Sequence, residues 1–404
     1  MAPPEAAFLD AVCADPAADG PRLIYADWLE DRGHPRGEFI RLQCALARLA
    51  PDDPLVRPLT QHLSTFGRYL SAWEAPLKGI VGGMEWARGF VETVNVEART
   101  FLRRATDLFR LAPVRRIRFL DVGTNLGRLM DSPFLGRLTA LTIFAQHIDE
   151  RLTRALVESP HLDGLRTLNI GRNRVGDRGA ERLAWSPRFR NLTELDLSDN
   201  AVGDLGMRAV AGAANLENLE VLELRRNEVT RAGLGDLCSS PVLKNLRRLG
   251  LALNYVGSPR DWAPPPAGGV SLRSLDLTDN VLAAEGVAVA TALPGLGDLL
   301  DLDLSRNDFG NAGAAVLAGW PGAASLRKLL LAETRIGDDG ARALAQSPYL
   351  FRLTDLNLSE NPVHDPGAFE FLNSPMLPRL RRLGLPHLGM TPQMRRALGV
   401  RFPG

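Results

Sequence analysis

The side chains of this sequence that could do chemistry are its histidines, cysteines and closely spaced acids. The six histidines share no short spacing typical of metal ligands: His34, His62, His147, His161, His364 and His387. The three cysteines stand far apart and imply no disulfide framework: Cys13, Cys44 and Cys238. Asp301 and Asp303 could in principle work as an acid and a base, but no insertion that would form a pocket surrounds them. We therefore expect no catalytic residue, no metal site and no cofactor.

Short motifs with a known mechanism are also missing. The sequence contains no GxxxxGK[ST] phosphate loop, no GxSxG nucleophile elbow and no HExxH zinc motif. Gly-Asp-x-Gly pieces at 176–179, 203–206 and 337–340 could be mistaken for phosphate loops. Because they recur with a fixed period, we interpret them as helix starts.

The composition limits the kinds of partner. The chain has 404 residues, of which 45% are hydrophobic and 24% charged, and its formal net charge is +1. This balance argues against a nucleic-acid binder that works by neutralising phosphates. The start MAPPEAAFLDAV lacks the basic region of a signal peptide, and no apolar run reaches 18 residues, so no membrane segment is expected. Cysteines that imply no disulfides favour a reducing compartment, and we predict a cytoplasmic protein.

Most of the sequence consists of one repeated phrase, L-x-x-L-x-L-x-x-N-x-hydrophobic, with a spacing of 27 residues and once of 26. Clear copies begin at Leu165, Leu192, Leu219, Leu246, Leu272, Leu299, Leu326 and Leu353. The asparagine position, which Thr334 fills once, is otherwise occupied by Asn173, Asn200, Asn227, Asn254, Asn280, Asn307 and Asn361. With weaker copies from Val91, Val114 and Leu138 and a truncated one from Leu380, the chain holds about twelve units.

Each unit is predicted to form a strand, a turn and a helix. Leu195 and Leu197 alternate as in a short strand with one buried face. The asparagine that follows can satisfy backbone groups where the chain bends away from the sheet, and stacked copies would do so at every turn. Aspartates shortly after it are the expected helix N-caps: Asp177, Asp204, Asp338 and Asp365.

The repeated phrase resembles the leucine-rich-repeat family, and the unit length and helical second half are similar to the ribonuclease-inhibitor-like subclass. The resemblance implies an α/β fold, a right-handed horseshoe solenoid with a parallel sheet on the concave side and helices on the convex side. One unit departs from the pattern, because prolines between 255 and 271 exclude an ordinary helix. That extended stretch is either a variant outer segment or a docking loop that displays Trp262.

The variable positions of the strand phrase are expected to face the concavity. Acids outnumber bases there, apart from a basic strip near residues 225–248. We predict that these residues bind a protein with a basic surface: Glu194, Asp196, Asp199, Glu223, Arg225, Arg226, Arg248, Asp276, Asp279, Asp301, Asp303, Asp355 and Glu360. The alternative is that they only solvate an exposed sheet face.

A different segment precedes the repeats. Residues 5–14, 22–32 and 36–49 have the spacing of three helices, and Gly33 suits the end of the second. This front resembles the small bacterial repeat-companion domain, a family without an established activity. Its candidate residues are Tyr25, Asp27, Trp28, Glu30, Arg36 and Glu38. Either Ile24, Trp28 and Leu29 pack against Phe8, Leu9 and Phe39 to form a lid, or Tyr25, Asp27 and the arginines bind a partner.

These observations give a domain plan and a functional prediction. A small all-α module is expected at 1–50, a connecting helix near 57–75 and a Gly-rich bend within 51–89, the solenoid at 90–390 and a closing helix within 391–404, with Thr391 as its N-cap. We predict a non-enzymatic protein-binding scaffold, monomeric by itself, that binds neither nucleic acid nor membrane. There are two alternatives. One is an enzyme with a hidden site, and the other is an enzyme regulator such as an inhibitor or a GTPase-activating protein. Ran GTPase-activating proteins share the repeat type, although this chain ends in GVRFPG and lacks their acidic tail.

Overall fold

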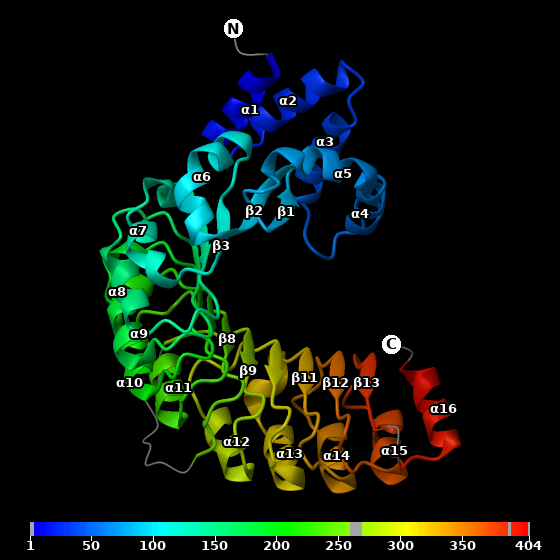
Figure 1. Ribbon diagram of the computed structural model, residues 1–404. Coiled ribbons are helices and arrows are strands. Elements are labelled where there is room, and N and C mark those ends of the chain that lie inside the picture. The colour runs from blue at the N-terminus through cyan, green and yellow to red at the C-terminus, as the bar shows by residue number, and fades with distance from the viewer. Residues whose placement is uncertain (1–3, 259–268, 387–388, 403–404) are drawn as a thin grey trace. The chain divides into compact units, whose positions relative to one another are not determined.

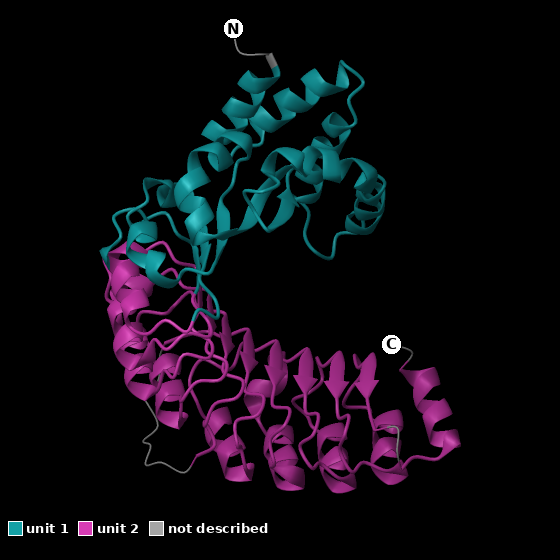
Figure 2. Cartoon of the chain, in the orientation of Figure 1, with its two compact units in different colours: residues 1–146, 158–169 teal, residues 147–157, 170–404 magenta. Residues whose placement is uncertain are grey.

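The chain divides into two compact units in the computed structural model, which describes residues 4–258, 269–386 and 389–402. Unit 1 comprises residues 1–146 and 158–169, and unit 2 comprises residues 147–157 and 170–404 (Figure 2). Residues 259–268, which include Trp262 and most of the proline-rich stretch, lie outside the described residues, as does His387. The sequence boundaries at residues 50, 89 and 390 remain a prediction.

Unit 1 begins with three helices, α1 (Pro4–Ala14), α2 (Gly20–Glu30) and α3 (Arg36–Leu46). Gly33, between the last two, has φ +66°, a conformation that favours glycine. The buried side of α2 carries Arg22, Tyr25, Ala26 and Leu29, a helical spacing of three and four residues. Ile24 lies off this stripe and is 58% exposed, so the prediction that it packs in the lid is wrong.

The region expected to hold one connecting helix and a bend is built differently. Two helices occupy it, α4 (Val56–Ser64) and α5 (Gly67–Glu74), and the break between them lets Phe66 turn inward against Phe39, at a ring distance of 5.6 Å. In place of the bend, β1 (Gly83–Ala87) pairs antiparallel with β2 (Phe90–Glu97). An antiparallel hairpin satisfies the backbone edge that the first parallel strand would otherwise expose.

The rest of unit 1 consists of parallel strands and helices. β2 is followed by α6 (Ala98–Leu111), β3 (Arg116–Leu120), α7 (Leu126–Met130), β4 (Ala140–Thr142) and β5 (Thr167–Asn169). β2 to β5 pair in parallel in the order of the chain. Phe90, at the start of β2, belongs to the same hydrophobic core as Tyr25 and Leu29 of α2, so the helices share a core with the first strands.

Unit 2 repeats one strand and one outer segment. Its strands are β6 (Glu194–Asp196), β7 (Val221–Glu223), β8 (Arg248–Gly250), β9 (Ser274–Asp276), β10 (Asp301–Asp303), β11 (Lys328–Leu330), β12 (Asp355–Asn357) and β13 (Arg382–Gly384). Its helices are α8 (Arg151–Glu158), α9 (Gly176–Ala184), α10 (Asp204–Gly212), α11 (Arg231–Cys238), α12 (Ala284–Thr291), α13 (Gly310–Ala318), α14 (Asp338–Ala345), α15 (Asp365–Asn373) and α16 (Pro392–Arg401).

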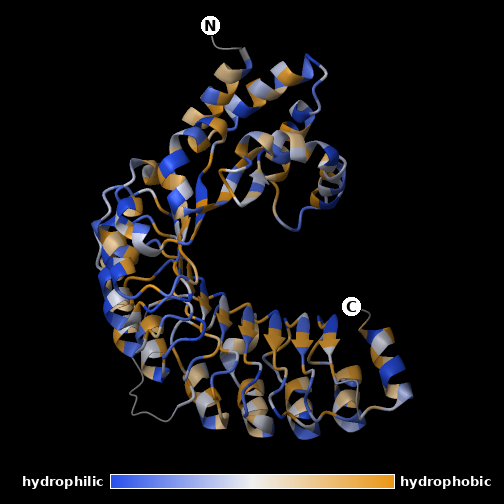
Figure 3. Ribbon diagram, viewed as in Figure 1, coloured by the Kyte–Doolittle hydropathy of each residue, from blue (hydrophilic) through white to orange (hydrophobic). Residues whose placement is uncertain are grey.

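The strands of unit 2 lie in register, and the helices lie behind them. Leu275, Leu302 and Leu329 occupy equivalent positions of neighbouring parallel strands and are buried. Figure 1 shows α12 to α15 on one side of strands β9 to β13, and Figure 3 shows hydrophobic residues in both layers. The structure thus confirms the predicted α/β repeat fold with a parallel sheet, helices on one side of it and further helices before the repeats.

The asparagines at the end of each strand phrase tie successive turns together. The Asn227 amide nitrogen donates to the carbonyls of Leu197 and Leu224, at 2.9 and 3.0 Å. Its Oδ1 accepts from the backbone N–H groups of Asn200 and Val202, each at 3.0 Å. All seven asparagines of this set are at most 5% exposed. Each therefore satisfies buried backbone groups of its own turn and of the turn before it.

The aspartates at the helix starts cap the neighbouring helix instead of their own, which corrects the expected N-caps. Asp177 Oδ1 accepts from the backbone N–H groups of Gly203 and Gly206, at 2.6 and 3.0 Å. Asp204 and Asp338 each bond backbone N–H groups at the start of the helix in the following repeat in the same way. Asp365 likewise accepts from the backbone N–H of Thr391. Stacking brings the unbonded N–H groups of the following helix within reach of the carboxylate. A Cβ at Gly206 would lie 2.8 Å from Asp177 Oδ1, which explains the glycine there.

α16 begins directly after Thr391, whose hydroxyl accepts from the backbone N–H of Met394, as expected for its N-cap. Across residues 4–258, 269–386 and 389–402, no helix has both the length and the apolar character needed to cross a bilayer.

Candidate partner-binding face

The predicted partner-binding residues of unit 2 lie on the strands and on the turns directly after them. We call this side of the sheet the strand face. None of the thirteen is buried: six are exposed and the other seven are half-buried. The exposed ones are Glu194, Arg225, Arg226, Arg248, Asp301 and Glu360. The sheet alternation therefore places them at the surface, while the leucines between them point to the helices.

Part of the charge on the strand face is neutralised within it. Arg248 Nε lies 3.1 Å from Glu223 Oε1, and Arg172 and Arg226 approach Asp199 at 3.5 and 3.9 Å. Partial exposure keeps each such pair weak, at about 0–1 kcal/mol. These pairs engage Asp199 after β6 and Glu223 on β7, and they neutralise Arg226 and Arg248 of the basic strip near residues 225–248.

Asp355 and Arg382 form a further ion pair across β12 and β13. Partial burial alone would raise the pKa of Asp355, but hydrogen bonds from Arg382 and Thr354 hold that pKa below its usual range. The carboxylate is thus firmly ionised and already paired, so it is a weaker candidate for binding a partner than the sequence suggested.

Four carboxylates on and after β9 and β10 remain available. We call Asp276, Asp279, Asp301 and Asp303 the acidic patch. In the part of the chain that the structure describes, none of the four forms an ion pair with a basic side chain. Asp276 and Asp303 are register partners on adjacent strands. Like charges directly opposite each other destabilise a sheet, so folding alone does not favour this arrangement.

A shallow cavity of about 280 Å³ lies at the acidic patch. The chain lines it with Arg248, Ser274, Leu275, Asp276, Asp301, Leu302, Asp303, Lys328 and Leu330. Leucine side chains form its apolar part, and its charged lining consists of three carboxylates and of Arg248 and Lys328, the last being the register partner of Asp301. Because Arg248 pairs with Glu223, the acids prevail in the cavity. A long cationic side chain could bury its methylene stem there while its charged end meets the acids.

Asp276 and Asp303 each use one carboxylate oxygen to stabilise the turn that follows their strand. Each Oδ1 accepts a hydrogen bond from the backbone N–H two residues later, of Thr278 and Ser305, both at 2.9 Å. Asn357 makes the equivalent bond to Ser359 N on β12, at 2.9 Å. The position therefore requires an acceptor but not a charge.

The accumulated negative charge affects Glu223 on β7. Burial raises the pKa of this carboxyl above its usual range, and the nearby Asp196 and Asp276 raise it further, while Arg248 acts in the opposite direction. Even with an arginine beside it, the carboxyl is less acidic than an isolated one. The raised pKa thus reflects burial first, and the neighbouring carboxylates add to it.

Reactive groups elsewhere offer little chemistry. Burial raises the pKa of Cys238 to about 12, and burial with nearby Asp10 raises that of Cys13 to about 11, so both thiols are poor nucleophiles. Cys44 is a buried free thiol as well. Within residues 4–258, 269–386 and 389–402, no group of three or more histidine, cysteine or acidic side chains could hold a metal ion.

The candidate residues of the N-terminal helices fall into two groups. On the surface, Asp27 and Glu30 both pair with Arg41, and Glu38 lies 3.2 Å from His62 Nε2. The other group faces inward: Tyr25 is 2% exposed, and Trp28 is half-buried with its ring 5.4 Å from that of Phe8.

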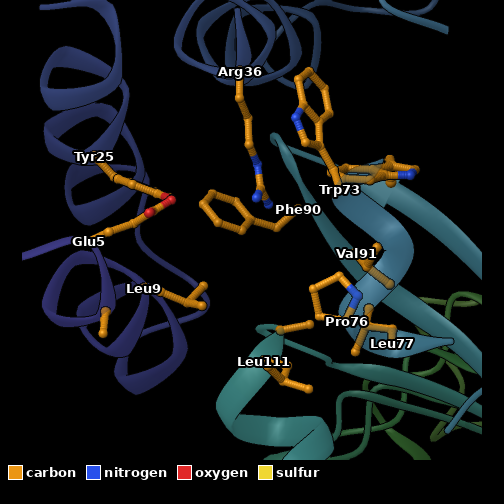
Figure 4. A pocket seen from close by; sticks show the side chains of 13 residues that line it. Glu5, Leu9, Tyr25, Arg36, Trp73, Pro76, Leu77, Phe90, Val91 and Leu111 are labelled. Carbon is orange, nitrogen blue, oxygen red and sulfur yellow. The ribbon is translucent and has the colours of Figure 1, made fainter. Parts of the chain in front are cut away.

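Arg36 also belongs to the inward group. Together with Tyr25 it lines a cavity among the helices and the β1–β2 hairpin (Figure 4). The structure therefore divides the six N-terminal candidates, which the sequence had grouped together, between the surface and the interior.

Sequence reasoning missed the part played by Arg22 and Glu92. Arg22 is fully buried, and its Nη2 lies 2.9 Å from Glu92 Oε1 and donates to the Pro16 carbonyl at 2.8 Å. Arg88 reaches the same Glu92 oxygen at 2.8 Å. The position of Arg22 three and seven residues before Tyr25 and Leu29 on one helical stripe was the only available signal.

Comparisons with known proteins agree with this architecture. A family model described as Leucine Rich repeat matches residues 165–184, 190–211, 270–289, 298–318, 323–345 and 352–372. A chain in the crystal structure of the Rad7 and Elc1 complex in yeast is similar, with a TM-score of 0.50 and 12% identity, over 98% of this chain and 96% of that chain. At this identity the similarity concerns the fold alone.

A chain of the mouse RP105/MD-1 complex matches more distantly, with a TM-score of 0.45 and 18% identity, over 76% of this chain and 51% of that chain. This chain thus spans about half the length of that one. No curated protein is significantly similar in sequence. The matched segments coincide with six strand–turn–helix units, of which the first begins with β5 in unit 1, and at these segments the chain carries leucine-rich repeats.

Proposed function

We propose that this protein is a non-enzymatic scaffold that binds a basic protein surface on the strand face of unit 2. The acidic patch is the observation that carries the proposal, because its four carboxylates lack an ion-pair partner among the described residues. A partner that places lysine or arginine there would relieve the repulsion between Asp276 and Asp303. The Rad7 and Elc1 structure, which shares the fold, is a complex of two proteins, in keeping with such a role.

Leucine and acidic side chains lie close together on this face, and that combination favours one class of partner. Leu275 and Leu302 are buried under the cavity, while Asp301 and Lys328 stand exposed at its border. An interface needs an apolar anchor as well as charges, since exposed charges mainly set the association rate. We therefore propose an arginine- or lysine-bearing loop or helix as the bound element.

The finer assignments belong to the same proposal. The unit length and the outer helices support the ribonuclease-inhibitor-like subclass. The N-terminal phrase from Arg22 to Gly33 supports a bacterial repeat-companion domain. Three buried free cysteines support a reducing, cytoplasmic compartment.

The test separates charge from structure. Affinity capture and mass spectrometry identify a partner, and its affinity is then measured by calorimetry for the purified proteins. The double variant Asp276→Asn/Asp303→Asn keeps the two turn bonds, as Asn357 does, but removes both charges. We expect its binding to weaken about tenfold or more, and the loss to shrink at high salt.

A matched control removes the same amount of charge away from the strand face. Glu181 in α9 and Glu285 in α12 are exposed helix residues, and Glu181→Gln/Glu285→Gln should bind like the wild type. Equal affinity of Asp276→Asn/Asp303→Asn and wild type would refute the strand-face site. If the partner is an enzyme, its rate with and without this protein then shows whether the scaffold is also a regulator.

A further inference from the structure

Unit 1 contains a cavity of about 320 Å³, distinct from the strand face. It lies among α1, α2, α3, α5 and the segment after it, the β1–β2 hairpin and the end of α6. Its wall is mostly apolar, with Leu9, Leu77, Phe90 and Val91 (Figure 4). Its volume is at the lower end of ligand pockets, about 300–1,000 Å³. A small molecule fits this size better than a protein segment.

The guanidinium of Arg36 enters this cavity without a partner. Its Nε is fully buried and forms no hydrogen bond within the described residues, although the residue as a whole is half-buried. The structure likewise gives it no carboxylate within ion-pair distance among those residues. An unpaired buried cation is costly, whereas a carboxylate bound to its planar fork would form two charge-assisted hydrogen bonds.

Aromatic rings surround the Arg36 guanidinium but accept no hydrogen bonds from its N–H groups. Its central carbon lies 5.0 Å from the Phe90 ring centre and 5.7 Å from those of Trp73 and Trp86. These cation–π contacts stabilise the charge and orient the side chain, yet they leave its N–H groups without acceptors. Burial lowers the pKa of Arg36, as expected for a cation in such surroundings.

An acid faces the same cavity from α1. The Tyr25 hydroxyl donates to Glu5 Oε1 at 2.8 Å, and Glu5 is exposed. Glu5 thus lies at the mouth of the cavity, and its Oε2 does not take part in the hydrogen bond with Tyr25. Arg36 and Glu5 therefore provide one positive and one negative charge at the same cavity, which attract each other electrostatically but form no direct ion pair among the described residues.

We propose that the cavity binds a free α-amino acid with a large apolar side chain. The ligand's carboxylate binds the Arg36 guanidinium, its ammonium binds Glu5 at the mouth, and its side chain packs against Leu9, Leu77 and Val91. A dipolar ligand matches two opposite, separated charges, and its zero net charge keeps the cavity neutral. This site is independent of the scaffold proposal, because it lies wholly in unit 1.

Calorimetric titration of the full chain with L-phenylalanine, L-leucine and L-tryptophan tests the proposal. At least one of them should bind, whereas L-phenylalanine amide, which lacks the carboxylate, and N-acetyl-L-phenylalanine, which lacks the ammonium, should each bind about tenfold or more weakly than L-phenylalanine. If none of the three amino acids binds, Arg36 is a structural residue and the proposal is wrong. Equal binding of the N-acetyl form would overturn the role of Glu5 and leave a simple carboxylate site.

Two variants identify the protein groups. Glu5→Gln changes an exposed side chain, so it should fold normally, weaken the free amino acid about threefold to tenfold and leave the N-acetyl form unaffected. Arg36→Met should abolish binding of every carboxylate. Its control is Arg32→Met, since Arg32 also stacks on a tryptophan, Trp28 at 4.0 Å, but on the exposed surface outside the cavity. Full binding by a folded Arg36→Met protein would contradict the proposal.

Discussion

The repeats of unit 2 and the helical core of unit 1 bury polar side chains in different ways. In the repeats these side chains are neutral, either hydroxyls such as Thr334 or amides such as Asn200 and Asn227. Each of these two amides bonds the backbone of its own and the neighbouring turn. In the helical core the buried polar side chains are charged: Arg22 is fully buried and Glu92 is 4% exposed. An amide can be repeated along an array because every turn offers it the same backbone groups.

A buried charge, in contrast, needs one specific partner at one place. Glu92 lies within 2.9 Å of both Arg22 and Arg88, which join α2 to the β1–β2 hairpin. Losing Glu92 would leave the fully buried Arg22 without a counter-charge in the interior. We therefore expect that loss of one buried charge destabilises the whole of unit 1. In the repeats, loss of one amide should destabilise its own turn and the neighbouring turns, as in an array of stacked units.

The largest expected effect comes from Glu92→Gln. The change keeps the shape of the side chain but leaves the buried Arg22 without a counter-charge, which should destabilise unit 1 by about 3–5 kcal/mol. Hydrogen exchange measured by mass spectrometry should show the loss of protection in Gly20–Glu30 and Phe90–Glu97, with little change in unit 2. The control Glu30→Gln removes a surface pair with Arg41 and should cost less than about 1 kcal/mol. Equal effects of the two variants would contradict the special role of the buried pair.

The next effect should follow Asn227→Leu in the repeats. The leucine is of similar size, but it leaves two carbonyls and two N–H groups without their side-chain partner, at a cost of about 3 kcal/mol. Exchange should increase around β6 and β7 and decay along the array. A loss of protection confined to residue 227 would show that the amides act separately and do not couple the turns.

Most of unit 2 could be predicted because the same sequence phrase, which indicates a strand, a turn and a helix, recurs with a fixed period. Leu195 and Leu197 are buried, as their alternation requires, and Thr391 caps the last helix. The helix caps were misassigned because the bond from Asp177 to Gly203 depends on the distance between stacked helices. A single unit's sequence contains no information about that distance.

The candidate sites were harder to predict than the fold. Alternation placed Asp276 and Glu223 at the surface, but only the side-chain geometry shows that Arg248 pairs with Glu223 and leaves the acidic patch unpaired. In unit 1 no period connects Arg22 with Glu92 or brings Trp73 and Trp86 to Arg36. Such contacts join residues far apart in sequence, so a local pattern cannot report them.

The smallest expected effect concerns Thr334, which replaces the asparagine in one of the eight clear copies of the repeat. Thr334 is fully buried, and its hydroxyl lies 2.8 Å from the Leu331 carbonyl. A threonine has no group equivalent to the amide nitrogen with which Asn307 bonds the Leu277 carbonyl of the turn before it. Thr334→Asn should supply that bond to the Leu304 carbonyl and stabilise the protein by about 0.5–1.5 kcal/mol.

Thermal unfolding of Thr334→Asn and of the control Thr334→Val would measure this effect. The valine keeps the shape but lacks the hydroxyl, so it should lower the midpoint temperature, whereas the asparagine should raise it. A lower midpoint for Thr334→Asn would mean that the turn around Thr334 has adapted to the smaller side chain. Each buried polar residue of the repeats would then depend on the packing of its own turn. The repeats would differ less from unit 1, where Arg22 and Glu92 depend on one specific arrangement.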